Sequence, residues 1–281
     1  MEGKNQSVLL SSVRNRLLGE AGKLDFRVGA TQAAVLLANL AAVLAPPSLG
    51  DLLVLLTSLL AVAWLFFSYR HVQTRSIGER ARRAALAVDG LGFRLDPDSL
   101  REILAEAQSL CPRGLDWKSF EQPDYFASAA PPGKTRLAEL LHECAFWSAE
   151  LHLAAARTLK EGSAAALLFS FLSLFAAIYW AGSGAMLGTL RFVLAFCSFL
   201  VSGEVLLRAF RHSSHGISIR AVELRVAALR RHSAARSESA PDIELLLALG
   251  DYNSEVEAAP MIPGWLFRRN RDRLNQLWAL K

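Results

Sequence analysis

Cysteine is scarce in this chain of 281 residues, and the three cysteines form no metal-binding pattern. Cys111, Cys144 and Cys197 include no CxxC pair. Their odd number and wide spacing indicate neither a zinc site nor the paired framework of a small secreted domain. We therefore expect a reducing compartment and neither a metal ion nor any other cofactor.

Catalytic patterns are missing as well. Residues 133–135 (GKT) resemble the end of a phosphate-binding loop, but Ser128 stands where the leading glycine is required, and no apolar strand precedes it. Residues 142–144 (HEC) are adjacent, so on a helix they point in different directions and cannot close on one metal ion without a distant partner. Because no catalytic constellation is present, we predict that the chain is not an enzyme.

Apolar residues, in contrast, are abundant. They make up 52% of the chain, whereas a soluble domain contains roughly 45–50% even with glycine included. The formal charge is +5. Such an excess suits a nucleic-acid-binding protein, but it also suits a membrane protein whose cytoplasmic parts collect Lys and Arg. Charge alone does not distinguish a nucleic-acid-binding protein from a membrane protein, so the distinction depends on the apolar runs.

Four apolar runs are long enough to cross a bilayer. The first has 18 uncharged residues and would cover about 27 Å as a helix, close to the thickness of the hydrocarbon core. Buried core helices are the alternative, but two short turns join the runs in pairs, which favours two membrane hairpins. A signal peptide does not fit, because 27 residues precede the first run and Pro46 would follow the cleavage site. The runs are 28–45, 52–67, 164–181 and 185–207.

Basic residues define the orientation of these hairpins. Of the 31 Lys and Arg residues, 30 lie outside the runs and their turns, and only Arg191 lies inside a span. Short loops rich in Lys and Arg stay in the cytoplasm, so both termini and the middle region are predicted to be cytoplasmic. This distribution explains the net charge, and we expect no nucleic-acid polymer as a partner.

The predicted fold class is an all-α integral membrane protein with four transmembrane helices in two hairpins. A helical cytoplasmic domain lies between the hairpins, and an amphipathic tail follows them. The segments are a cytoplasmic amphipathic N-terminal helix (1–27), transmembrane hairpin 1 (28–67), a cytoplasmic helical domain (68–162), transmembrane hairpin 2 (163–207) and a cytoplasmic basic amphipathic tail (208–281).

Several cytoplasmic helices are predicted from periodicity and caps. Leu10, Val13 and Leu17 share one side of an N-terminal helix, with Arg14 on its polar side. Asp96 and Pro97 predict a helix start, and that helix should run to 110. Further helices are expected from 134 into the third span, around 219–229 after the fourth span, over 242–249, and near the C-terminus.

Two basic segments suit a membrane surface. The arginines at 70, 75, 80, 82 and 83 follow the second span directly and can bind anionic headgroups there. The basic final helix carries Trp265, Phe267 and Trp278. Its mixture of aromatic and basic residues predicts that it lies on the membrane surface.

Polar residues within the spans are candidates for a pore or gate. Arg191 can also snorkel to the outer headgroups, and Glu204 can pair with Arg208 one turn further along. Gln32 and Asn39, seven residues apart, form a polar line that holds helices together or faces water. The pore or gate candidates are Gln32, Asn39, Arg191, Ser198 and Glu204.

Two stretches and the order of the segments carry a resemblance. The stretches are 136–151 (RLAELLHECAFWSAEL), which includes Arg136, Cys144 and Trp147, and 251–267 (DYNSEVEAAPMIPGWLF). With the order hairpin, cytoplasmic middle, hairpin and basic tail, they resemble the bacterial four-transmembrane pore-forming effectors that accompany nucleotide second-messenger synthases in anti-phage defence. The resemblance covers nearly the whole chain.

The resemblance implies an oligomeric effector in the bacterial inner membrane. A cyclic nucleotide from a partner synthase, or another infection signal, would bind the cytoplasmic region, and a pore would then open or assemble and disrupt the membrane. A phosphate-bearing ligand requires basic residues and an aromatic platform; the candidates are Arg94, Trp117, Tyr125, Lys134 and Arg136. The alternative function is a non-conducting membrane scaffold or signalling partner whose cytoplasmic helices bind a protein.

Overall fold

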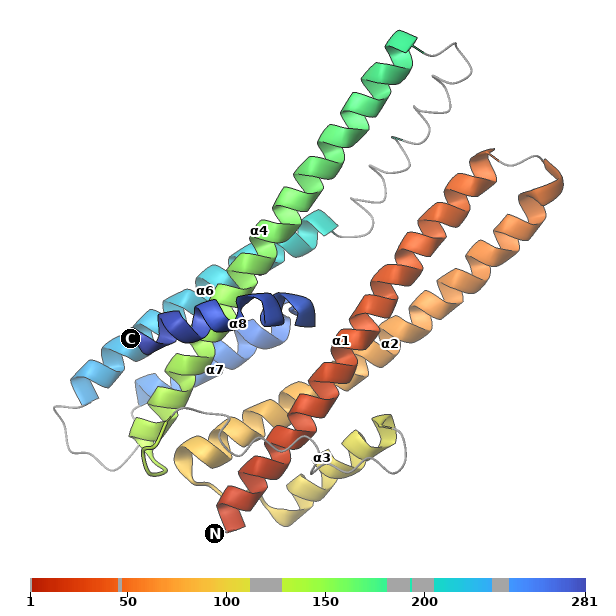
Figure 1. Ribbon diagram of the computed structural model, residues 1–281. Helices are drawn as coiled ribbons and strands as arrows, with labels where there is room; N and C mark the ends of the chain where they lie inside the picture. Colours follow the sequence, from red (N-terminus) through yellow and green to blue (C-terminus); the bar gives the residue numbers. More distant parts are fainter. Residues whose placement is uncertain (1, 45–46, 112–127, 181–192, 194–204, 234–242) are drawn as a thin grey trace. The chain divides into compact units, whose positions relative to one another are not determined.

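The computed structural model of the chain describes residues 2–44, 47–111, 128–180, 193, 205–233 and 243–281. These residues form seven helices and no strand, so the all-α class is confirmed for the part of the chain that is described (Figure 1). The helices are α1 (Glu2–Leu44), α2 (Pro47–Leu91), α3 (Pro97–Leu110), α4 (Lys134–Trp180), α6 (Val205–Ser233), α7 (Ile243–Ala258) and α8 (Gly264–Ala279).

The chain divides into two compact units. The first contains 1–22, 71–153 and 214–281, and the second contains 23–70 and 154–213. The helices α1, α2, α4 and α6 each supply residues to both units. The second unit includes both predicted hairpins; that these lie in a bilayer stays a prediction.

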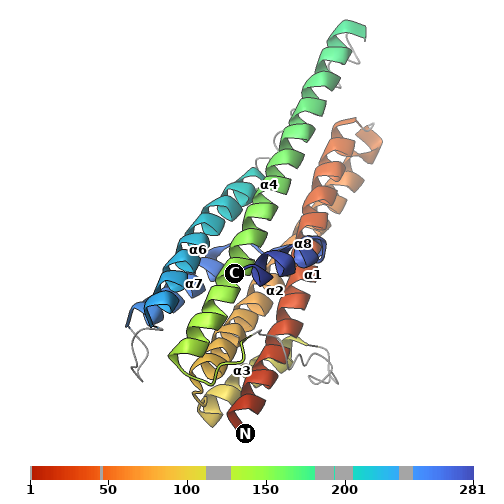
Figure 2. The same cartoon turned by 60° about the vertical axis from the view of Figure 1, so that its left-hand side comes forward.

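The main core of the first unit joins α2, α4, α6 and α7. Leu137, Leu140 and Leu141 of α4 are fully buried, and they pack with Ile219 and other apolar residues of α6 and α7. Figures 1 and 2 show α7 beside the first half of α4. Residues three and four apart share one side of a helix, so the spacing in the sequence is the reason that these side chains meet. The helices predicted from 134 and around 219–229 are confirmed.

A second core joins α1, α2 and α3. Leu10, Val13 and Leu17 of α1 are fully buried and pack against small residues of α2 and against Ile103 of α3. The helix α3 begins as predicted, because the carboxylate of Asp96 accepts hydrogen bonds from the backbone N–H groups of residues 98 and 99, at 3.1 and 3.2 Å. This cap satisfies two of the N–H groups that a helix start leaves unpaired.

Glycine allows α2 and α4 to approach closely at the end of α2. A Cβ atom added at Gly90 would lie 2.8 Å from Cδ1 of Leu137 and 3.1 Å from its Cα. Gly92 follows the last turn with φ of +72°, and its N–H group donates to the carbonyl of Val88. Only glycine adopts this backbone conformation without strain, so α2 ends here and the chain turns toward α3.

The helix predicted over 242–249 is longer in the structure. It extends as α7 to Ala258 and passes through Gly250. Tyr252 is buried and Val256 packs against the main core of the first unit. Packing of these two side chains outweighs the low helix propensity of glycine, so the prediction of an end at 249 is wrong.

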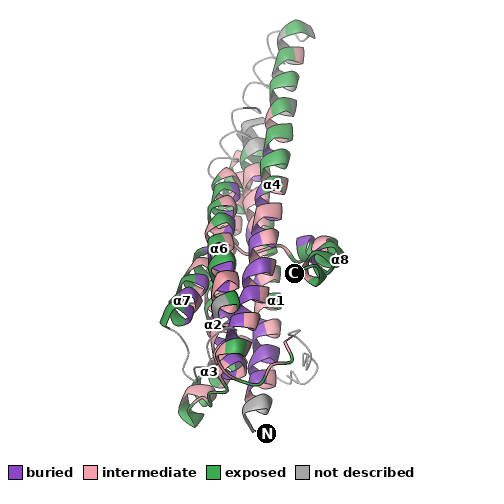
Figure 3. Ribbon diagram, turned by 90° about the vertical axis from the view of Figure 1, so that its left-hand side faces the viewer, coloured by how far each residue is buried: buried purple, intermediate pink, exposed green. Residues whose placement is uncertain are grey.

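The second unit exposes many large apolar side chains. Along α4, burial falls from the first half to the second, where Leu168, Phe171 and Phe175 are each at least 61% exposed (Figure 3). In α2, Leu52, Val54, Leu55, Leu59, Val62, Leu65 and Phe66 are at least 57% exposed.

One helix among the described residues, from Leu49 to Leu91, is long and apolar enough to cross a membrane. Its most apolar 18 residues have a mean hydropathy of 2.2, and none of them is buried. The predicted runs 28–45 and 164–181 fall mainly in α1 and α4, and most of 185–207 lies outside the described residues.

Candidate functional site

The first unit contains a cavity of about 910 Å³ between α1, α2, α4, α7 and α8. Four arginines and two glutamates contribute to its wall, so the lining has a net positive charge even when His152 is neutral. Three aromatic residues and several aliphatic residues form the rest. The polar and aromatic lining residues are Arg14, Asn15, Arg75, Glu79, Arg82, Glu143, Cys144, Trp147, Ser148, His152, Tyr252, Phe267, Arg271 and Asn275.

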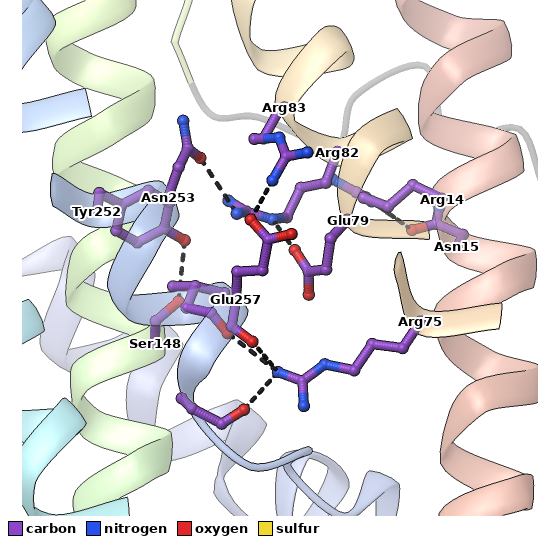
Figure 4. Close-up of polar contacts among 12 residues, drawn as sticks. Arg14, Asn15, Arg75, Glu79, Arg82, Arg83, Ser148, Tyr252, Asn253 and Glu257 are labelled. Carbon is purple, nitrogen blue, oxygen red and sulfur yellow. Dashed lines mark hydrogen bonds and ion pairs between the residues drawn. The ribbon is translucent and has the colours of Figure 1, made fainter. Parts of the chain in front are cut away.

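Arg82 lies at the centre of the polar contacts in this cavity (Figure 4). Its Nε donates to Glu79 at 2.5 Å, its Nη2 donates to Asn253 at 3.1 Å, and its guanidinium carbon lies 5.1 Å from the ring centroid of Tyr252. Burial disfavours the charge of this guanidinium, but Tyr252 and Glu79 raise its pKa above the usual value. Its Nη1 is buried and has no hydrogen-bond partner among the described residues.

Arg75 connects α2 to the end of α7. Its Nη2 donates to the carbonyls of Val256 and Glu257, both at 3.1 Å, and to that of Ala259. These carbonyls belong to the last turn of α7 and the residue after it, where a helix leaves C=O groups unpaired. About two turns further along α2, Arg83 forms an ion pair with the carboxylate of Glu257. The two arginines hold the C-terminal end of α7 against α2.

Arg14 differs from its predicted position on the polar side of the N-terminal helix. The residue is only 5% exposed, and it lines the cavity. Its Nε and Nη2 donate to the side-chain oxygen of Asn15, at 3.1 and 2.6 Å. The amide nitrogen Nδ2 of Asn15 is buried without a hydrogen-bond partner among the described residues.

The aromatic part of the wall comes from α4, α7 and α8. The rings of Trp147 and Phe267 lie with centroids 5.8 Å apart. Tyr252 and Ser148 share a hydrogen bond of 3.0 Å, and burial raises the pKa of the Tyr252 phenol. Burial also raises the pKa of the Cys144 thiol to about 11. Both groups are therefore neutral at pH 7, and Cys144 is not an activated nucleophile.

A second polar cluster surrounds Glu223, whose side chain is 1% exposed. Its carboxylate contacts Arg220 at 2.5 Å and also Lys281. Arg230 donates to Nδ1 of His142 at 2.7 Å, so Nε2 of His142 carries the proton that faces Glu223 at 3.7 Å. Burial alone would raise the pKa of Glu223, but the hydrogen bonds from His142, Lys281 and Arg220 outweigh it and lower this pKa to about 2.

The final helix packs on protein in the structure. Leu266 and Leu274 of α8 are buried, and Leu274 lies in a cluster with Phe146 and Leu151 of α4. The ring of Trp278 lies 5.4 Å from that of Phe146. The apolar side of α8 thus covers α4; that this helix also lies on the membrane surface stays a prediction.

The predicted ligand-binding residues do not come together at the cavity. Nη2 of Arg136 donates to both carboxylate oxygens of Asp89, at 3.1 and 2.9 Å, and its Nε and Nη1 donate to backbone carbonyls, which favours a structural role. Lys134 begins α4, and Arg94 is exposed in the connection before α3; neither they nor Arg136 line the cavity. Trp117 and Tyr125 lie outside the described residues.

The pore or gate candidates are described only in part. Gln32 is half-buried and Asn39 is exposed, both on α1 within the second unit. Arg191, Ser198 and Glu204 lie outside the described residues. Their predicted roles stay predictions.

The cavity arginines of α2 were assigned to lipid headgroups by the sequence. In the structure Arg75 and Arg82 bind α7 and Glu79, Arg83 binds Glu257, and Arg80 pairs with Glu102 of α3 at 2.8 Å. The spacing of residues 75, 79 and 82 shows that they share a side of a helix. It does not show which element covers that side, so sequence reasoning missed the cavity.

Among the described residues, no group of three or more His, Cys, Asp or Glu side chains is placed to hold a metal ion. Comparisons of the chain with protein-family models, with curated proteins and with solved structures find no match.

Proposed function

We propose that this chain is a bacterial inner-membrane effector of anti-phage defence. On sensing a nucleotide second messenger or another infection signal, it opens or assembles a pore and disrupts the membrane. In this proposal the hairpins 28–67 and 163–207 supply four spans of a homo-oligomer, and both termini and the middle domain are cytoplasmic. The chain binds lipid and a small ligand and catalyses no reaction.

The observation that carries this proposal is the apolar surface of α2. Leu52, Leu59 and Val62 are at least 60% exposed, and the most apolar 18 residues of the helix have no buried member. Soluble monomeric proteins rarely expose so large a continuous apolar surface, because its contact with water is unfavourable. Lipid tails would solvate it.

The sensing half of the proposal is supported by the cavity of the first unit. A cavity of about 910 Å³ lies within the range of roughly 300–1,000 Å³ that small-molecule sites occupy. The helices α1, α2 and α4 are continuous and supply residues to both units. A ligand that favours one of two arrangements of these helices would change the population of that arrangement throughout their length.

Expression of the full chain in bacteria, with a dye that reports membrane potential, tests the pore. Cells would receive a panel of cyclic nucleotides, and Arg191→Ala and Glu204→Ala would be compared with the parent chain. We expect depolarisation with one member of the panel and a changed response in at least one variant. Arg269→Ala, an exposed residue of α8, is the control and should leave the response unchanged.

An intact potential under every condition, with the protein shown to be in the membrane, would contradict the pore. It would favour the alternative of a non-conducting scaffold.

A further inference from the structure

We propose that the cavity of the first unit binds a small molecule that carries both a phosphate group and a flat aromatic ring, as a nucleotide does. The proposal deepens the function proposed above, since it names the site and the chemistry of the signal. Its test in solution does not depend on pore formation.

Charge is the first argument. Arg14, Arg75, Arg82 and Arg271 contribute four positive charges to the lining, against Glu79 and Glu143. The planar guanidinium group donates two parallel hydrogen bonds to phosphate oxygens, and it keeps its charge even when it is buried. An anion would therefore be favoured in this cavity over a neutral molecule of the same shape.

Unused donors are the second argument. Arg82 and Asn15 both line the cavity, and their Nη1 and Nδ2 atoms are buried without a hydrogen-bond partner among the described residues. A buried donor without an acceptor costs free energy. Phosphate oxygens are acceptors of the required kind, so a bound phosphate toward which either side chain turned would relieve this cost.

Aromatic rings are the third argument. Trp147 and Phe267 lie 5.8 Å apart by centroids, and Phe267 is 44% exposed. Tyr252 lines the cavity as well, with Arg82 beside its ring. Aromatic side chains bind the flat faces of nucleobases by stacking. Charge and rings within one cavity favour a ligand that has both parts over inorganic phosphate or an apolar molecule.

Two polar partners hold the guanidinium of Arg82 in place. Glu79 and Asn253 fix two sides of its guanidinium and leave the third nitrogen without an acceptor. A donor that is held in place before binding loses little conformational freedom on binding. Arg271, in contrast, is exposed on α8 at the wall of the cavity, so it can be changed with little effect on the fold.

Isothermal titration calorimetry of the full chain in detergent tests the inference. The probes are adenosine monophosphate, a cyclic dinucleotide of adenosine, adenosine, inorganic phosphate, and vesicles of phosphatidylglycerol. We expect at least one nucleotide to bind, and adenosine and phosphate to bind at least about tenfold more weakly, because each lacks one part of the ligand. Arg271→Ala should weaken nucleotide binding about tenfold through the loss of a charged hydrogen bond.

Two further variants complete the design. Arg269→Ala removes an arginine of the same helix that does not line the cavity, and it should bind like the parent chain. Arg82→Lys keeps the charge beside Glu79 but removes the planar fork, so it should weaken binding while the thermal unfolding temperature reports whether the fold is kept.

Binding of no nucleotide at millimolar concentration, binding to vesicles alone, or equal nucleotide affinity in both Arg271→Ala and a folded Arg82→Lys would overturn the inference. Nucleotide binding without depolarisation in cells would leave the site standing and contradict the pore. Depolarisation by a nucleotide that does not bind in this cavity would support the pore and contradict the proposed site.

Discussion

At the scale of single residues, the first unit depends on charges that are buried in pairs. Glu223 is the clearest case, since its side chain is 1% exposed and contacts Arg220 and Lys281. A carboxylate so enclosed is stable only with its cationic partners, because desolvation otherwise favours the protonated form. The C-terminal residue Lys281 is thereby fixed to α6.

Acid should weaken this cluster in a defined pH window. The pKa of Glu223 is lowered from about 4.5 to about 2 in the folded chain, so its contribution to stability is present above pH 4.5 and is lost as the pH falls toward 2. The contribution is up to roughly 3 kcal/mol. Thermal unfolding at a series of pH values should therefore show a shallower acid dependence for Glu223→Gln than for the parent chain.

Glu102 provides the matched comparison. Its pKa is also lowered, by the hydrogen bond from Arg80, but the carboxylate is on the surface. Exposed ion pairs contribute little to stability, so Glu102→Gln should unfold with the same acid dependence as the parent chain. An equal loss of acid dependence in both variants would contradict the role given to Glu223.

Arg136 is expected to stabilise the fold and to leave ligand binding unchanged. Its guanidinium joins Asp89 at the end of α2 to the backbone at 128 and 130. Arg136→Ala should lower the free energy of unfolding by about 2–4 kcal/mol, because it leaves the half-buried Asp89 without its partner. Denaturant unfolding measures this loss.

The double variant with Asp89→Ala should lose less than the sum of the two single changes. A folded and fully stable Arg136→Ala that no longer binds nucleotide would instead support the ligand role predicted from the sequence.

At the scale of helices, the sequence predicted the features that depend only on neighbouring residues in the chain. The start of α3 follows from Asp96 and Pro97, and the buried side of α4 follows from spacing alone. The end of α7 did not follow, because it depends on packing of Tyr252 and on carbonyls that bind Arg75, a residue 181 positions away from Val256. Sequence patterns identify the side of a helix that needs a partner, and they do not identify the partner.

The same limit explains the site. Arg14 was predicted on the polar side of its helix and Arg82 at anionic lipid headgroups, since arginine is usually exposed. The structure instead surrounds them with α4, α7 and α8. The basic final helix was assigned to the membrane because of its amphipathic pattern, and the same pattern allows its apolar side to pack on α4.

Close packing of α2 on α4 gives a prediction for the element scale. Gly90→Ala should lower the free energy of unfolding by about 1–3 kcal/mol, because its Cβ would lie 2.8 Å from Cδ1 and 3.1 Å from Cα of Leu137. Gly19→Ala is the control, since a Cβ at that helical position meets nothing within 4 Å. Alanine there should stabilise the chain by up to about 1 kcal/mol. Equal effects of the two changes in thermal unfolding would contradict close contact at Gly90.

At the scale of the whole molecule, the two units differ in what their surfaces require. Buried clusters collect many large side chains of the first unit, although Leu247 and others are exposed, and Arg82 and Arg136 pair with carboxylates of the protein. The second unit has apolar residues exposed along α2 and the second half of α4. A continuous row of exposed apolar side chains, such as the one along α2, favours lipid or a protein partner over water.

A charge placed on each surface separates these environments. Leu59 on α2 and Leu247 on α7 are both 60% exposed, so the two positions differ in their unit and not in their burial. An arginine at the centre of a membrane span costs roughly 3 kcal/mol during insertion, whereas an arginine on a hydrated surface costs almost nothing. Leu59→Arg should therefore reduce the fraction of the chain that stays with membranes after alkaline carbonate extraction, and Leu247→Arg should not.

The same pair of variants distinguishes lipid from a protein partner around α2. If another protein covers this helix, carbonate should release the parent chain from membranes, and Leu59→Arg should change the size of the soluble assembly in gel filtration. If lipid covers it, the parent chain should resist extraction, because only hydrophobic contact with the bilayer survives high pH. Release of the parent chain would remove the basis for four spans, while retention of the parent chain together with loss of Leu59→Arg would place α2 in the hydrocarbon core.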